Sequence, residues 1–262
     1  MKKIFYYTKI WFKIAGNSIA NWTANGKVLL VFLLGKIIRL AAYFGFVYFL
    51  LGGSGGLLNY SREQVIFFMT TYVFIDTVAQ FFFRNVYSFR QLIVSGDFDL
   101  VLVKPMSALF RSLLGGPDPI DLITIPPIII LLIWAGSLLS PVPIDIIAYL
   151  ILLVNSIIIA CSFHIFVLGF GIITLEVDHM VMVYRDLTSM GRFPVDIYKE
   201  PLNWFLTYLI PVGIMFTVPG RALAGLVKPG GIILSFIFGV LCLYLSLRFW
   251  QFALKRYTSA SS

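Results

Sequence analysis

The sequence predicts an all-α, polytopic membrane protein with six transmembrane helices and an N-terminal interfacial amphipathic helix. Of its 262 residues, 60% are hydrophobic and only 12% are charged, whereas soluble domains carry about 25% charged residues. A water-soluble core cannot bury that much apolar surface, so lipid must solvate most of the chain. We therefore expect residues 1–262 to form a single transmembrane domain.

Six apolar windows have the length that a transmembrane helix requires, about 20 residues. They lie near residues 28–51, 64–83, 122–139, 144–174, 202–218 and 232–252. Links with almost no charge alternate with links rich in Lys and Arg, which are the N-terminal segment, the central link after the second window and the C-terminus. Because such links mark the cytoplasmic side, both termini are predicted to be cytoplasmic. The net charge of +8 fits this role and requires no nucleic acid.

Residues 4–22 are too polar to span a membrane but have helical periodicity. The residues that recur on one side are Ile4, Tyr7, Trp11, Ile14, Ser18 and Trp22. Lys9 and Lys13 fall largely on the other side. This pattern is typical of a basic amphipathic helix in the cytoplasmic interface. The alternative is that these residues are the start of the first span.

Four polar residues interrupt the first two windows: Lys36, Arg39, Asp76 and Gln80. Counted from the cytoplasmic ends of their helices, Lys36 and Asp76 both lie about 12 to 14 Å deep. Because intramembrane charge requires a partner or water, Asp76 is predicted to pair with Lys36 or Arg39. The group is interpreted either as a wall of a translocation path or as a structural ion pair.

No catalytic or metal site is expected. His164 and His179 lack the spacing of a metal or acid–base motif. Cys161 and Cys242 lie inside apolar windows and are expected to be ordinary core or lipid-facing residues.

The central link contains SGDFDLVLVKPMSALFRSL at residues 95–113. Its charged side chains cannot enter lipid, so they must face water or another protein. Gly96 permits a turn, Asp97 and Asp99 are expected to cap the following helix, and Lys104 with Pro105 is expected to end it.

Four segments carry a resemblance to a known family. They are GDFDLVLVKP (96–105), RFPVDIY (192–198), PLNWFLTYLIP (201–211) and PGRALAG (219–225). Together they resemble the permease subunits of ABC-2 type transporters, within a six-span branch of about the length of this chain. The resemblance covers essentially the whole chain.

The resemblance implies a transport subunit, not an enzyme, in the bacterial cytoplasmic membrane. It implies export through a path at the interface with a second copy or a sister permease. A separate ABC ATPase would bind ATP and Mg, with no cofactor in this chain, which contains no G-x-x-x-x-G-K-[ST] motif. The segment 89–111 would dock on that ATPase through Arg90, Gly96, Asp97, Asp99, Leu100, Lys104, Pro105 and Arg111. The alternative is a lipid-surface helix without a partner.

The resemblance also offers a second position for the fifth span, at 175–194, with 202–218 as a re-entrant hairpin. Hydropathy favours 202–218, because the other segment carries Glu176, Asp178, His179, Arg185 and Asp186.

Two other functions stay open. An ATPase-independent secondary transporter would usually show internal repeats, which are not evident here. A membrane-embedded enzyme would require a nucleophile or a metal set beside the intramembrane charges. The sequence does not distinguish drug, peptide, lipid and polysaccharide substrates.

Overall fold

A computed structural model describes residues 2–24, 26–52, 56–57 and 59–258. In this part of the chain, five helices are long and apolar enough to cross a membrane. They are α2 (Gly26–Gly52), α3 (Arg62–Phe83), α7 (Pro119–Ser137), α8 (Pro143–Thr174) and α12 (Pro229–Leu254). A bent helix pair counts as a sixth crossing if it is one span. The prediction of an all-α, polytopic membrane protein is confirmed.

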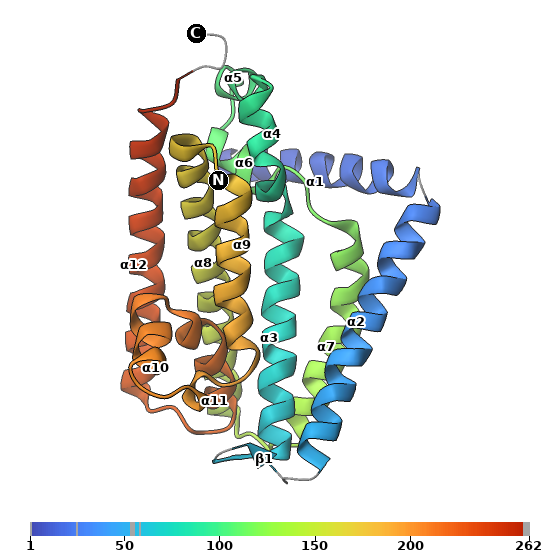
Figure 1. Ribbon diagram of the computed structural model, residues 1–262, viewed down its shortest axis with the longest axis vertical. Helices are drawn as coiled ribbons and strands as arrows, with labels where there is room; N and C mark the ends of the chain where they lie inside the picture. Colours follow the sequence, from blue (N-terminus) through green and yellow to red (C-terminus); the bar gives the residue numbers. More distant parts are fainter. Residues whose placement is uncertain (1, 25, 53–55, 58, 259–262) are drawn as a thin grey trace.

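The two ends of the bundle differ (Figure 1). One end, which we call the basic end, carries α1 (Lys2–Thr23) lying across the bundle, the end of α12, and the short helices α4 (Phe89–Val94), α5 (Asp97–Leu102) and α6 (Ala108–Leu114). The opposite end carries the antiparallel pair β1 (Gly56–Leu57) and β2 (Tyr60–Ser61), together with α10 (Leu202–Trp204) and α11 (Val218–Leu223).

Helix α1 is separate from α2, because α1 ends at Thr23 and α2 begins at Gly26. One face of α1 contacts the bundle: the Trp11 ring lies 6.1 Å from that of Phe81, and the Ser18 hydroxyl donates to the Pro117 carbonyl at 2.8 Å. A second face exposes Phe5 and Phe12, and a third exposes lysines. A helix with one face on the protein, one apolar exposed face and one basic exposed face is typical of a membrane interface.

Helix α8 is central and packs along α12, α3 and α9 (Val177–Ser189). Glycines permit close approach: a side chain at Gly169 would meet the Phe249 ring, and one at Gly239 would meet the Asn155 amide. The starts of α3 and α7 are fixed by local signals. Ser61 forms a capping box with Gln64, and the Asp118 carboxylate accepts from the Ile120 N–H at 2.9 Å.

The chain between α8 and α12 differs from the favoured prediction. In Figure 1, α8 ends at the basic end, α9 carries the chain back beside α3, and α12 starts at the opposite end. Residues Leu202–Leu209 and Gly213–Leu223 form two arms bent by 76°, and both lie toward the opposite end. The segment predicted as the fifth span, 202–218, is thus a sharply bent pair of helices rather than one straight helix. Helix α9 lies in the alternative segment, 175–194, and the choice between the two segments as the fifth span stays a prediction.

Hydropathy gave α9 a low score because it counts all residues alike, whereas one side of α9 packs inside the bundle. Val177, Val181 and Tyr184 are buried, and the Tyr184 ring lies 4.5 Å from the His164 ring of α8. The remaining elements are the 3-10 helices η1 (Arg84–Ser88), η2 (Met190–Arg192) and η3 (Val195–Ile197), and the π-helices η4 (Phe205–Leu209) and η5 (Gly213–Thr217).

Polar contacts hold the bent pair in place. The Ser156 hydroxyl of α8 donates to the Met215 carbonyl at 2.7 Å, and the Thr217 hydroxyl accepts from the Val195 N–H at 3.0 Å. Asp196 accepts from the Tyr60 hydroxyl and lies 3.6 Å from Arg221. These bonds satisfy backbone groups that the irregular helices would leave unpaired in lipid.

The contact between α8 and α12 generates a prediction. Gly239→Ala would push the Asn155 side chain away from the Ser235 carbonyl, to which its amide donates at 2.9 Å. Overpacking of this kind costs about 1 to 3 kcal/mol, so a lower melting temperature in detergent is expected. Gly45→Ala is the control, because no atom lies within 4 Å of its added methyl group. Equal melting temperatures for both variants would contradict the packing.

Candidate functional site

A polar crevice lies between α2, α3, α7 and α9. It consists of two adjoining cavities of about 130 and 400 Å³ that share Arg39, Asp76, Thr77 and Arg185 in their walls. The smaller cavity continues to Tyr43, Tyr72 and Arg192, and the larger one to Lys36, Gln80, Arg84, Asp118, Asp121 and Trp22 of α1. Since one water occupies about 30 Å³ of liquid, the crevice has room for several waters.

Two ion pairs line the larger cavity. Lys36 of α2 pairs with Asp121 of α7, and both side chains are largely buried. Arg84, just beyond α3, lies 3.7 Å from Asp118. The predicted pairing of Lys36 with Asp76 is therefore wrong.

The error has a simple physical cause. The estimate from helical rise placed Lys36 and Asp76 at one depth, but it gave no information on which neighbour α2 faces. The apolar window predicted for the third span also began at residue 122, which left Asp118 and Asp121 outside the membrane. The helix α7 in fact begins at Pro119, so both carboxylates lie at its start and reach the crevice.

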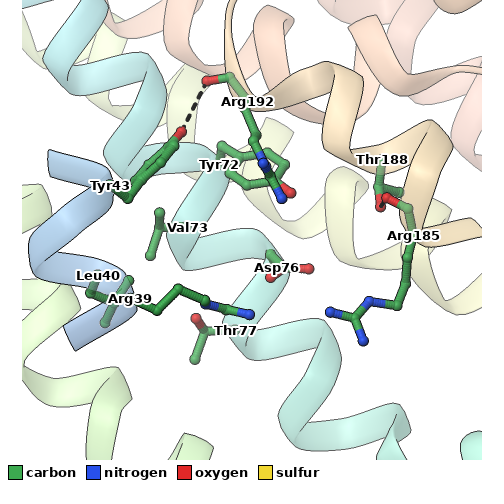
Figure 2. A pocket seen from close by; sticks show the side chains of 10 residues that line it. All are labelled: Arg39, Leu40, Tyr43, Tyr72, Val73, Asp76, Thr77, Arg185, Thr188 and Arg192. Carbon is green, nitrogen blue, oxygen red and sulfur yellow. Dashed lines mark hydrogen bonds between the residues drawn. The ribbon is translucent and has the colours of Figure 1, made fainter. Parts of the chain in front are cut away.

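Asp76 faces three arginines from separate elements (Figure 2). Arg39 extends from α2, Arg185 from α9 and Arg192 from the end of η2, and all three point toward the space around Asp76. Among the described residues, no carboxylate oxygen lies within 4.0 Å of these guanidinium nitrogens. The predicted ion pair between Asp76 and Arg39 is thus not formed. The Tyr43 hydroxyl donates to the Arg192 carbonyl at 3.3 Å.

Gln80 continues this stripe toward the basic end. Its carbonyl oxygen accepts from Arg84 at 3.3 Å, and its amide donates to the Tyr87 hydroxyl at 3.0 Å. Asp76, Gln80 and Arg84 therefore share one face of the chain, as their spacing predicts.

The segment 89–111 forms three short helices at the basic end. Gly96 has a φ of 79°, so the turn between α4 and α5 requires a conformation that favours glycine. Gly96 is itself the N-cap of α5 and makes no side-chain bond. The predicted capping by Asp97 and Asp99 is therefore wrong: both lie in the first turn, where negative charge complements the helix dipole. Helix α5 ends at Leu102, just before Lys104 and Pro105.

Buried contacts anchor α5 to the rest of the molecule. Phe98 is fully buried between the rings of Phe89 and Tyr257, which lie 5.1 Å away. The Tyr257 hydroxyl, just beyond α12, donates to Asp99 at 2.9 Å. Burial, followed by this bond, raises the pKa of Tyr257 to about 12.

Helix α1 contacts the same segment. The Tyr6 hydroxyl donates to the Pro105 carbonyl at 3.3 Å, and the Tyr7 hydroxyl accepts from the Ser107 N–H at 3.1 Å. The Tyr7 ring also lies 4.7 Å from that of Phe110.

The residues predicted to dock on a partner divide into two groups. Leu100 is 58% exposed, and Asp97, Lys104 and Pro105 are exposed as well. Arg90, Asp99 and Arg111 make contacts inside the chain: Arg90 lies 3.8 Å from Asp178, and Arg111 donates to the Gly115 carbonyl at 2.8 Å. Sequence reasoning missed Val103, which is 80% exposed.

The described residues contain no group of three His, Cys, Asp or Glu side chains that could hold a metal ion. His164 is buried, and its Nδ1 lies 2.7 Å from the carbonyl of Ala160 in its own helix.

Comparison with known families identifies the family of this chain. A family model described as ABC-2 family transporter protein matches residues 36–261. The chain belongs to the ABC-2 transporter family. The comparison with curated proteins gave no match. The resemblance found in the sequence is confirmed, and this ABC-2 permease is a multi-pass membrane protein with a transport role.

The ion pair of α2 with α7 generates a prediction. Lys36→Met and Asp121→Asn should each lower the yield of folded ABC-2 permease, because each leaves one charge buried and unpaired, at a cost of about 3 to 5 kcal/mol. The double variant should recover much of the loss. The measurement is the monodisperse fraction after detergent extraction, with Lys36→Met plus Asp76→Asn as the control combination. Strictly additive losses for Lys36 and Asp121 would contradict the pair.

Proposed function

We propose that this ABC-2 permease forms the membrane pathway of an exporter in the bacterial cytoplasmic membrane. A separate ATPase that binds ATP and Mg drives it, and a second copy or a sister permease completes the path. The observation that carries the proposal is the exposed apolar surface of α5 at the basic end, on a segment that is otherwise firmly anchored.

This surface lies where an ATPase could reach it. Leu100 and Val103 are exposed, and Leu102 is 38% exposed, while α5 lies at the tip of the basic end (Figure 1). An apolar surface outside the hydrocarbon is a typical protein contact. Lys104 and Asp97 at its edge supply the polar rim that a reversible interface requires.

The anchoring of α5 supports a coupling role. Phe98 and the bond between Asp99 and Tyr257 fix α5 to the end of α12, and α12 packs along α8. A partner that moves α5 would therefore move a rigid helix rather than a free loop. A secondary transporter does not require such a surface, and for this reason we favour the ATPase-driven function.

The distribution of charge supports cytoplasmic termini. The start of α1, the segment 89–111 and the end of α12 lie at the same end of the bundle, and these are the Lys- and Arg-rich parts of the sequence. By the positive-inside rule, this end faces the cytoplasm.

The packing of α2 supports a path at a subunit interface. Within its most apolar stretch no side chain is buried in the chain itself, and the polar crevice lies directly beside it. On the α2 side, the crevice is therefore walled by a single helix that the rest of the described chain leaves uncovered, and a second permease would cover it.

The test is co-purification of the ATPase with permease variants. Leu100→Ala should weaken the complex by about 1 to 3 kcal/mol, because it removes a central apolar contact of the interface. Leu138→Ala is the matched control: Leu138 is 44% exposed and follows α7 at the opposite end. Asp99→Lys is a poorer test than Leu100→Ala, because Asp99 also holds Tyr257. If the Leu100→Ala permease retained the ATPase at the wild-type ratio, α5 would not be part of the interface.

A further inference from the structure

The crevice has a surplus of positive charge. Five cationic side chains line it, together with three carboxylates. Asp121 pairs with Lys36, and Asp118 lies beside Arg84. What is left is a single carboxylate, Asp76, facing the three guanidinium groups of Arg39, Arg185 and Arg192.

Such an arrangement is costly in a membrane unless an anion or water compensates it. Each cation at membrane depth loses its hydration, which makes it costly without a partner. Asp76 can offset part of the charge of its neighbours, but one carboxylate cannot neutralise three guanidinium groups. The free donors of the arginines point into a cavity rather than into packed side chains.

The donors have the chemistry of an oxyanion site. Guanidinium groups present planar pairs of N–H donors that match phosphate and carboxylate oxygens. Hydroxyl groups surround them, because Tyr72, Thr77 and Thr188 also line the smaller cavity. The three arginines come from three different elements, so an anion among them would bridge α2, α9 and η2.

The wall of the larger cavity indicates what the anion is attached to. Val31 and Phe32 of α2 line it and are 68% and 57% exposed, within the apolar stretch of α2 that no other described part of the chain buries. The Trp22 ring of α1 lies 5.9 Å from that of Phe32. Polar head and apolar tail would thus find adjoining surfaces in one crevice.

We propose that Arg39, Arg185 and Arg192 bind the phosphate or carboxylate group of an anionic amphiphile, whose apolar chain lies along α2. Only the step that makes this ligand the exported cargo rests on the proposed function. Binding itself requires no ATPase, so it is testable on the permease alone.

The experiment titrates purified permease, without ATPase, with short-chain phosphatidylglycerol, short-chain phosphatidylcholine or inorganic phosphate. The concentration dependence of the melting temperature gives each affinity. We expect phosphatidylglycerol to bind at least roughly tenfold more tightly than phosphatidylcholine, since both lipids carry a phosphate but the choline ammonium adds a positive charge that the arginines repel. Tighter binding of phosphatidylglycerol than of inorganic phosphate supports an amphiphilic ligand. Equal affinity for phosphatidylglycerol and inorganic phosphate would assign the site to a soluble anion and overturn the proposed lipid ligand.

Variants test the arginines. Arg185→Gln and Arg192→Gln should each weaken phosphatidylglycerol roughly tenfold, and Arg185→Lys should retain part of the affinity. Asp76→Asn should strengthen binding, because it removes the carboxylate that repels the ligand. Arg248→Gln, an exposed arginine of α12 away from the crevice, is the control and should bind as wild type does.

Equal binding of both lipids to the wild type would overturn the proposal, and so would unchanged binding by the two Gln variants. If these variants do not fold, the Asp76→Asn result decides, and weaker binding by that variant would overturn the proposal. Retention of the ATPase by Leu100→Ala, which would contradict the proposed interface, leaves these lipid measurements untouched, so failure of either proposal is recognised separately.

Discussion

The cost of placing charge in hydrocarbon governs the arrangement of this bundle. A charge at membrane depth must meet an opposite charge, a hydrogen-bonding partner or water. Lys36 meets Asp121, and this contact joins α2, whose most apolar stretch is not buried in the chain, to α7. Around it, α3 and α9 contribute the remaining polar side chains, so a crevice forms where four elements present charge to one another.

The same cost explains why α9 can be so polar. Its apolar residues Val177, Val181 and Tyr184 pack inside the bundle, and Arg185 faces the crevice. At the opposite end, the Met215 carbonyl accepts from the Ser156 hydroxyl, and the Thr217 hydroxyl accepts from the Val195 N–H. Residues 211–217 of this irregular segment are buried, as a lipid environment requires of backbone outside regular α-helices. The basic end, by contrast, holds α5 through aromatic packing and leaves Leu100 exposed.

Sequence patterns predicted the features that lipid imposes on one helix at a time. The helices α2, α3, α7, α8 and α12 each fall on an apolar window, because a helix in lipid must be apolar over its length. Sequence patterns failed to predict contacts that depend on which helices lie side by side. The partner of Lys36 is 85 residues away in the chain, and Tyr257 is 158 residues from Asp99. Neither contact leaves a signal in the local sequence. Hydropathy likewise could not show that one side of a polar helix such as α9 packs inside the protein.

The hydrated crevice is the central claim, and its most direct test is the accessibility of cysteine. In a Cys161→Ala, Cys242→Ala background, Gln80→Cys places a thiol on the crevice wall, whereas Ile130→Cys places one on a 69% exposed position of α7. Thiol reagents react with the thiolate, which forms where water reaches the sulfur. In nanodiscs, a charged maleimide should label Gln80→Cys rapidly and Ile130→Cys slowly. Equal and slow labelling at both positions would contradict a water-filled polar crevice in this permease.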